Sequence, residues 1–124
     1  MSQDIFKKGR QKRRKVMGNA FIDRALSQAD ELTMPIQDFV THSAWNEIWN
    51  REALSARDRS LINLGRIAAL NRPHEFKGHV RGALDNGVSP EEIWEVCMQI
   101  AEYCTFFVGL DSRRDAMEVI DDDN

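Results

Sequence analysis

The segment that most constrains the fold is residues 89–104, which carries both a helix start signal and one apolar helix face. Ser89 is a residue type favoured at helix N-caps, Pro90 suits the first helical position, and Glu92 completes a capping box. The apolar residues that follow recur at helical spacing: Ile93, Val96, Cys97, Ile100, Ala101 and Cys104. These features predict a helix that begins at about residue 90 and reaches about residue 106.

The same periodicity recurs along the chain, and no strand-like alternation of useful length interrupts it. Ser55 and Asp58 form a variant capping box, Asn71 tolerates the left-handed conformation that stops a helix, and Gly87 adopts it most easily. The helices predicted from these signals cover residues 56–70 and 73–85 and, as shorter elements, residues 8–17, 21–28, 35–40 and 111–120. The sequence therefore predicts an all-α fold.

Length and composition favour one soluble domain over residues 1–124. With 124 residues, 42% of them hydrophobic and 30% charged, the chain can bury one real core. No apolar run approaches the roughly 20 residues that a membrane span needs, and no secretory signal is recognisable, so we expect a cytoplasmic protein. Cys97 and Cys104 are about 10 Å apart along a helix, which is too far for a disulfide, and no zinc-binding pattern is present.

The net charge of −3 is unevenly distributed. The first residues are strongly basic, and the acidic end is Asp121–Asp123; the basic residues are Lys7, Lys8, Arg10, Lys12, Arg13, Arg14 and Lys15. One interpretation is a nucleic-acid-binding arm. The alternative is a solvated first helix or a helix that packs on a neighbouring subunit. We favour the alternative because nothing else in the chain supports nucleic-acid recognition.

Two segments could contribute to a functional site. Residues 45–51 place Trp45 and Trp49 around Glu47, with Arg51 close behind. This mixture suits the wall of a pocket. Two tryptophans four residues apart could equally be core anchors, and spacing alone favours that interpretation.

The second segment follows Pro73, where Glu75 and His79 share one helix face at i, i+4 spacing. A carboxylate beside an imidazole favours the charged ring and fixes its orientation, as a general acid or base near neutral pH requires. Alternatively, Glu75 is an acidic residue that stabilises the helix N-terminus, and His79 is a surface or hydrogen-bonded core histidine. Spacing alone favours this second interpretation.

Taken in order, several short strings of the sequence resemble the carboxymuconolactone decarboxylase family over about residues 10–110. They are Arg13-Arg14-x-Val16-x-Gly18, Phe39, Trp45-x-Glu47-Ile48-Trp49-x-Arg51, Arg59-Ser60-Leu61, Ala69-Leu70-Asn71-Arg72, Glu75-x-x-x-His79-x-Arg81-x-Ala83, Asn86-Gly87-Val88, Glu92-Ile93-x-Glu95-Val96 and Tyr103-Cys104. The resemblance implies an alkyl hydroperoxidase D-like helical bundle that forms a homo-trimer or homo-hexamer. It also implies decarboxylation of 4-carboxymuconolactone to an enol-lactone in protocatechuate breakdown, without cofactor or metal.

The resemblance also implies roles for particular residues. His79, oriented by Glu75, would deliver a proton to the dienolate or donate a hydrogen bond to the lactone oxygen, and Glu47 is a second acid/base candidate. The residues that would bind the substrate are Arg59, Arg51, Trp45, Trp49 and Cys104. Among them, Arg59 and Arg51 would act as carboxylate clamps. The dithiol of the related peroxidases is absent, because Arg72 and Glu75 occupy its two positions.

Two departures from the family pattern affect the substrate expected. Residues 105–111 replace a segment of small residues, and Arg66 stands where the family helix is usually apolar. A buried arginine needs an acidic partner or a bound anion, although Arg66 could instead face a subunit interface. The chain could therefore be a related lyase or isomerase acting on another acidic, enolisable substrate, or a non-catalytic oligomeric binding protein.

Overall fold

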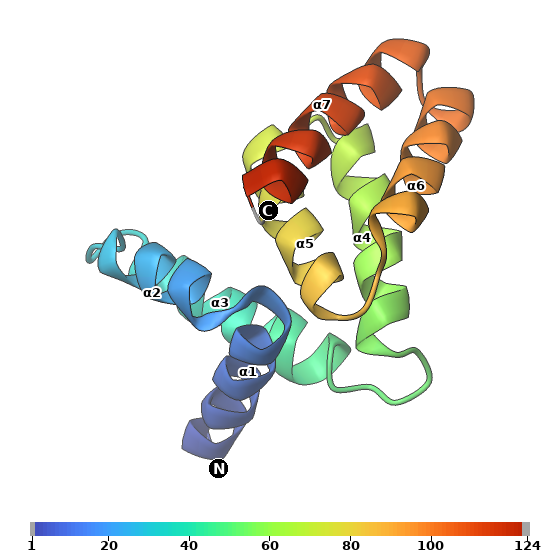
Figure 1. Cartoon of the computed structure of the whole chain (residues 1–124). Coiled ribbons are helices and arrows are strands. Elements are labelled where there is room, and N and C mark those ends of the chain that lie inside the picture. The colour runs from blue at the N-terminus through green and yellow to red at the C-terminus, as the bar shows by residue number, and fades with distance from the viewer. Residues whose placement is uncertain (1, 123–124) are drawn as a thin grey trace. The chain divides into compact units, whose positions relative to one another are not determined.

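A computed structural model describes residues 2–122, and within that range the regular structure is helical (Figure 1). The predicted all-α fold is therefore confirmed. The chain divides into two compact units, one ending at Ser55 and the other beginning at Ala56, and each is described by itself. Over residues 2–122, none of the helices combines the length and the apolar character that crossing a membrane requires.

The first unit contains three α-helices and one π-helix: α1 (Ser2–Met17), α2 (Asn19–Ser27), α3 (Met34–Val40) and η1 (Thr41–Ile48). α1 begins earlier than predicted and ends before Gly18, whose φ of 91° breaks the helix. α1 packs closely on η1, since a Cβ atom at Gly9 would lie 2.3 Å from the carbonyl oxygen of Thr41. The contact requires a glycine on α1.

The π-helix η1 continues α3 without a break and was not predicted. Its wider turn is visible in the hydrogen bond that the Trp49 N–H donates to the Ala44 carbonyl, five residues back, at 2.9 Å. The Thr41 hydroxyl also donates to the Gln37 carbonyl at 2.8 Å, a back-bond that competes with the regular α-helical pattern. The sequence predicts no regular element over residues 41–48, because apolar spacing does not distinguish a π-turn from an irregular segment.

The second unit consists of four helices around one core: α4 (Ala56–Ala69), α5 (Pro73–Asp85), α6 (Pro90–Tyr103) and α7 (Phe106–Asp122). Each helix contributes apolar side chains to this core, with Leu64, Val80 and Ile93 fully buried. In Figure 1, α6 and α7 run side by side and are joined by a tight corner. The packing holds α4 and α5 against each other, and these two helices carry most of the candidate site.

The helix ends of the second unit follow the predicted signals. Asn71 has a φ of 59° after α4, and Gly87 has a φ of 90° after α5. At the start of α6, the Ser89 hydroxyl accepts a hydrogen bond from the Glu92 N–H at 3.1 Å, and the Glu92 carboxylate accepts one from the Ser89 N–H at 3.1 Å. The capping box at this helix start is confirmed.

The boundary between α6 and α7 was predicted incorrectly. α6 ends at Tyr103, not near residue 106, and α7 begins at Phe106, not at residue 111. The Thr105 hydroxyl accepts a hydrogen bond from the Val108 N–H at 3.0 Å, so it caps the new helix. A Cβ atom at Gly109 would lie 2.6 Å from the Ala101 Cβ, so the close approach of α7 to α6 requires this glycine.

The basic residues of α1 are mostly exposed, as expected of a solvated first helix. Arg13 is buried: its Nη1 donates to Gln37 Oε1 at 2.8 Å, and burial lowers the pKa of its guanidinium. Cys97 is buried, Cys104 is exposed, and both are free thiols, as predicted.

Candidate active site

Helix α5 presents His79 one turn after Glu75, as the i, i+4 spacing predicts. Pro73 at the helix start and the Asn86-Gly87 end fix the extent of α5. Glu75 lies in the first turn and is exposed, whereas His79 is partly buried between the buried residues Gly78 and Val80. The imidazole is thus held at the edge of the core while the carboxylate remains in water.

The charge state of His79 differs from the prediction. Burial is the largest influence on the ring, the positive charge of Arg66 adds to it, and together they lower the pKa of His79 to about 4. Glu75 acts in the predicted direction and raises the pKa, but its effect is the smallest of the three. His79 is therefore neutral near pH 7, and the predicted imidazolium held by Glu75 is not supported.

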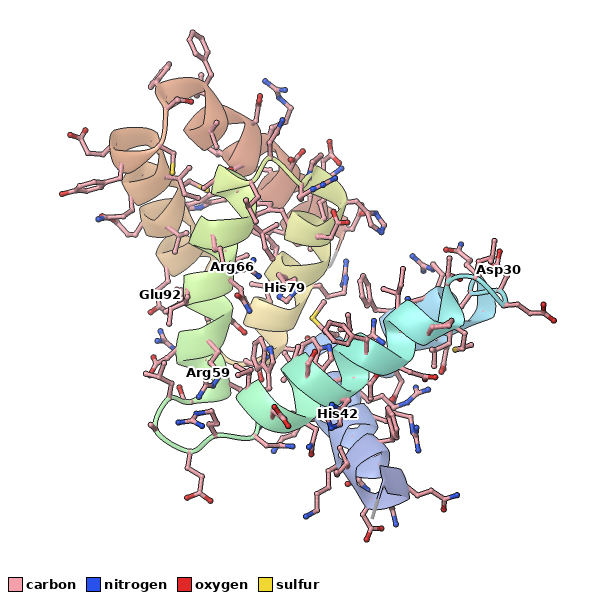
Figure 2. All side chains as sticks on the ribbon, turned by 180° about the vertical axis from the view of Figure 1, so that it is seen from behind. Asp30, His42, Arg59, Arg66, His79 and Glu92 are labelled. Atoms are coloured by element: carbon pink, nitrogen blue, oxygen red, sulfur yellow. The ribbon has the colours of Figure 1, made fainter. Side chains whose placement is uncertain are left out.

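Helix α4 carries a polar stripe opposite this ring. Arg59, Asn63 and Arg66 follow i, i+4, i+7 spacing and so share one face of α4. The Arg66 Nε donates a hydrogen bond to Asn63 Oδ1 at 3.2 Å. Figure 2 shows Arg59 and Arg66 on α4, with Arg66 beside His79 of α5.

The environment of Arg66 corrects one of the predicted alternatives. Arg66 is exposed, so this chain does not bury it in the core, and its Nε donates a hydrogen bond to the neutral Asn63. Arg59 is only partly exposed. Asn63 was not singled out in the sequence, although its position between the two arginines on one helix face could have revealed it.

The other predicted site residues before α4 belong to the first unit. Trp45 and Trp49 are each 5% exposed, and their rings stack with centroids 4.7 Å apart. These two side chains therefore act as core anchors of η1, the interpretation that spacing alone favoured. Glu47 and Arg51 are exposed.

His42, also on η1, was not singled out in the sequence. Its Nε2 lies 4.0 Å from the Glu47 carboxylate, and its ring centroid lies 6.0 Å from that of Phe6. A shallow apolar groove beside it is lined by Ile5, Phe6, Pro35, Asp38, Phe39 and His42. Only the fold reveals this grouping, because its residues come from two separate stretches of the chain, 5–6 and 35–42.

In the second unit, Cys104 is exposed where α6 ends. A cavity of about 20 Å³, large enough for a water molecule, lies where α4, α5 and α7 meet. Asn71, Phe76 and Asp115 are among its lining residues, and His79 is not. The structure therefore brings together Arg66 and His79, with Asn63 beside the arginine, and this group is separate from the small cavity.

Comparison with known proteins matches residues 35–122 to the carboxymuconolactone decarboxylase family. The chain belongs to this family. The match includes all of α4 to α7 and extends back through η1, and it confirms the resemblance found in the sequence. Two relatives of the family carry decarboxylase names.

The 4-carboxymuconolactone decarboxylase of Acinetobacter baylyi is 29% identical over 117 residues, which cover 94% of this chain and 84% of the relative. The nitrosuccinic acid decarboxylase of Metarhizium robertsii is 37% identical over 100 residues, which cover 81% of this chain and 70% of the relative. These names support a decarboxylase of the carboxymuconolactone decarboxylase family.

Proposed function

We propose that this protein decarboxylates an organic acid whose own structure accepts the electrons released with CO₂, so that the reaction needs no cofactor. The first candidate substrate is 4-carboxymuconolactone, converted to an enol-lactone. The observation that carries the proposal is a partly buried His79 on α5 beside Arg66 on α4, in a member of a family whose relatives are named decarboxylases.

The chemistry requires two contributions from the protein. When the C–C bond to the carboxylate breaks, its electron pair moves through the double bond into the lactone carbonyl and gives a dienolate. A hydrogen-bond donor must stabilise the negative charge on that oxygen, and a proton must then reach carbon. The electron sink is part of the substrate.

His79 suits the first contribution. A neutral imidazole carries one N–H. This group can donate a hydrogen bond to the substrate oxygen on which negative charge develops. Arg66 adds positive charge close to the same position. We therefore assign His79 as the donor to the acceptor oxygen, and Arg59, in the same unit, remains a candidate carboxylate-binding residue.

A second candidate substrate is nitrosuccinic acid, because the relative with that name has the higher identity of the two, 37%. One carboxyl group of this compound is bonded to the carbon that bears the nitro group. Its loss as CO₂ places the electron pair on the nitro oxygens as a nitronate, which is then protonated on carbon. Both candidates are dicarboxylic acids that deliver negative charge to an acceptor oxygen, so one donor serves either reaction.

The test is CO₂ release from each compound by the purified protein, corrected for spontaneous loss. We expect turnover of at least one compound, and His79→Ala should lower kcat by about 10²- to 10³-fold, the usual cost of removing an oxyanion donor. His74→Ala, which changes an exposed histidine on the same helix, is the matched control. A protein that binds these acids but never releases CO₂ would be a binding protein, and full activity in His79→Ala would refute the assigned role.

We also propose that the chain forms a homo-oligomer, a trimer or a hexamer. Large apolar side chains are exposed at the corner between α6 and α7, where Tyr103 is 78%, Phe106 62% and Phe107 75% exposed. Such a group of exposed apolar side chains favours association. Sedimentation velocity at micromolar concentration should show a trimer or a larger species, and a monomer would contradict the proposal.

A further inference from the structure

The polar stripe on α4 places positive charge beside the candidate donor. Arg59 and Arg66 lie seven residues apart, about two turns and 10 Å along the helix axis, with Asn63 between them on the same face. The partly buried His79 faces the Arg66 end from α5.

Arg66 has the chemistry of the carboxylate-binding end. Its Nε is hydrogen-bonded to Asn63 Oδ1 at 3.2 Å, which restrains the guanidinium plane. Asn63 is neutral, so this contact leaves the positive charge uncompensated. A restrained guanidinium can bind a carboxylate through two parallel hydrogen bonds from its terminal amino groups.

The substrate group that Arg66 binds can be deduced from the neighbouring histidine. If the His79 N–H donates to the acceptor oxygen, a second oxyanion of the same small molecule falls near Arg66, whose charge reaches the imidazole. Both candidate substrates keep one carboxylate after CO₂ is lost. A guanidinium on the departing carboxylate would hold that charge in the ground state and oppose its loss, so the retained carboxylate is the productive partner.

We propose that Arg66 binds the carboxylate that the substrate retains, so that the site selects dicarboxylic acids over monoacids with the same acceptor group. This inference rests on the proposed decarboxylase function. Binding a group whose charge does not change during the reaction stabilises substrate and transition state equally, so it acts on KM and not on kcat.

The test compares Arg66→Gln and Arg66→Lys with the parent protein, with Arg114→Gln as control because Arg114 is an exposed arginine on α7. In Arg66→Gln we expect KM to rise by about 10- to 100-fold while kcat stays within about twofold, the usual cost of a lost charge-assisted hydrogen bond. The KM of Arg66→Lys should lie between those of Arg66→Gln and the parent protein, since lysine keeps the positive charge but cannot form two parallel hydrogen bonds. The control should match the parent protein, and circular dichroism would confirm that each variant is folded.

Each other kinetic result overturns the inference. An unchanged KM would show Arg66 to be a solvated surface residue. A large fall in kcat in Arg66→Gln would show that Arg66 binds the acceptor oxygen. A rise in kcat would show that it binds the departing carboxylate.

Ligand binding tests the same point without turnover. The probes are 3-nitropropionate and its methyl ester, which differ in one negative charge. Binding of the acid, followed by NMR titration, should weaken by about 10- to 100-fold in Arg66→Gln while binding of the ester stays the same. If the parent protein releases no CO₂ but discriminates acid from ester through Arg66, the decarboxylase function fails and the carboxylate site stands. If it turns over substrate without this discrimination, the inference fails and the function stands.

Discussion

The two units of the molecule are stabilised in different ways. In the second unit, explicit end signals bound the helices, and four helices share one continuous core. In the first unit, α3 buries no residue, α1 depends on a close approach at Gly9, and α3 passes directly into a π-helix. The second unit is therefore held by a continuous core between helices with recognisable ends, whereas the first depends more on individual contacts.

The largest difference should come from two phenylalanines. Phe76 is 2% exposed in the core of the second unit, and Phe39 on α3 is 69% exposed. Phe76→Ala should reduce the free energy of unfolding by about 3–5 kcal/mol, because it removes buried area and leaves a cavity. Phe39→Ala should change it by less than about 0.5 kcal/mol. Urea unfolding of both variants measures these changes. An equal decrease in the free energy of unfolding for Phe76→Ala and Phe39→Ala would refute the difference between the two units.

Glycine substitutions should give an intermediate effect. Gly109→Ala forces a Cβ to 2.6 Å from Ala101 and should cost about 1–3 kcal/mol, since α6 and α7 must move apart. Gly65→Ala is the matched control on α4: no atom lies within 4 Å of its Cβ, so it should be neutral or stabilising by up to about 1 kcal/mol. In thermal unfolding, Gly109→Ala should lower the melting temperature, whereas Gly65→Ala should leave it unchanged or raise it. A lower melting temperature for Gly65→Ala would contradict the packing described.

Gly9→Ala extends this comparison to the first unit. Its Cβ would meet the Thr41 carbonyl oxygen at 2.3 Å, a backbone atom that cannot rotate away. Amide exchange should accelerate in α1 and η1 while the core of α4 to α7 keeps its protection. Uniform acceleration across the chain would show that the two units unfold together.

The smallest effect should come from helix capping. Ser89→Ala removes the hydroxyl that accepts from Glu92 N–H and should cost about 1 kcal/mol. Ser27→Ala, which removes an exposed hydroxyl bonded to the Arg24 carbonyl, should cost less than about 0.5 kcal/mol. Chemical unfolding that ranks the two in the reverse order would contradict the importance of the capping box.

The fold was predictable where one residue carries the conformational information. Asn71, Gly87 and Ser89 mark the ends and starts of α4 to α6, because each residue type has a strong preference for that backbone conformation or hydrogen bond. The cap at Thr105 is an equally local signal that went unrecognised. The π-helix at residues 41–48 depends on hydrogen bonds between residues five apart, which no apolar pattern specifies.

For Glu75 and His79, the sequence predicts the shared helix face but not the charge state of the ring. Helical spacing places His79 and Glu75 on one face of α5, as found. The pKa of the ring depends instead on burial and on Arg66, which comes from a different helix. Packing between α4 and α5 decides that balance, and spacing along one helix cannot reveal it.

The most direct test of the account is an NMR pH titration of the His79 imidazole. A neutral ring beside Arg66 predicts a midpoint near pH 4, well below the ordinary value of about 6.5, and an unprotonated ring at pH 7. Because the guanidinium lowers the pKa, Arg66→Gln should move the midpoint upward. A midpoint at or above 6.5 in the parent protein, unaffected by Arg66→Gln, would contradict the account.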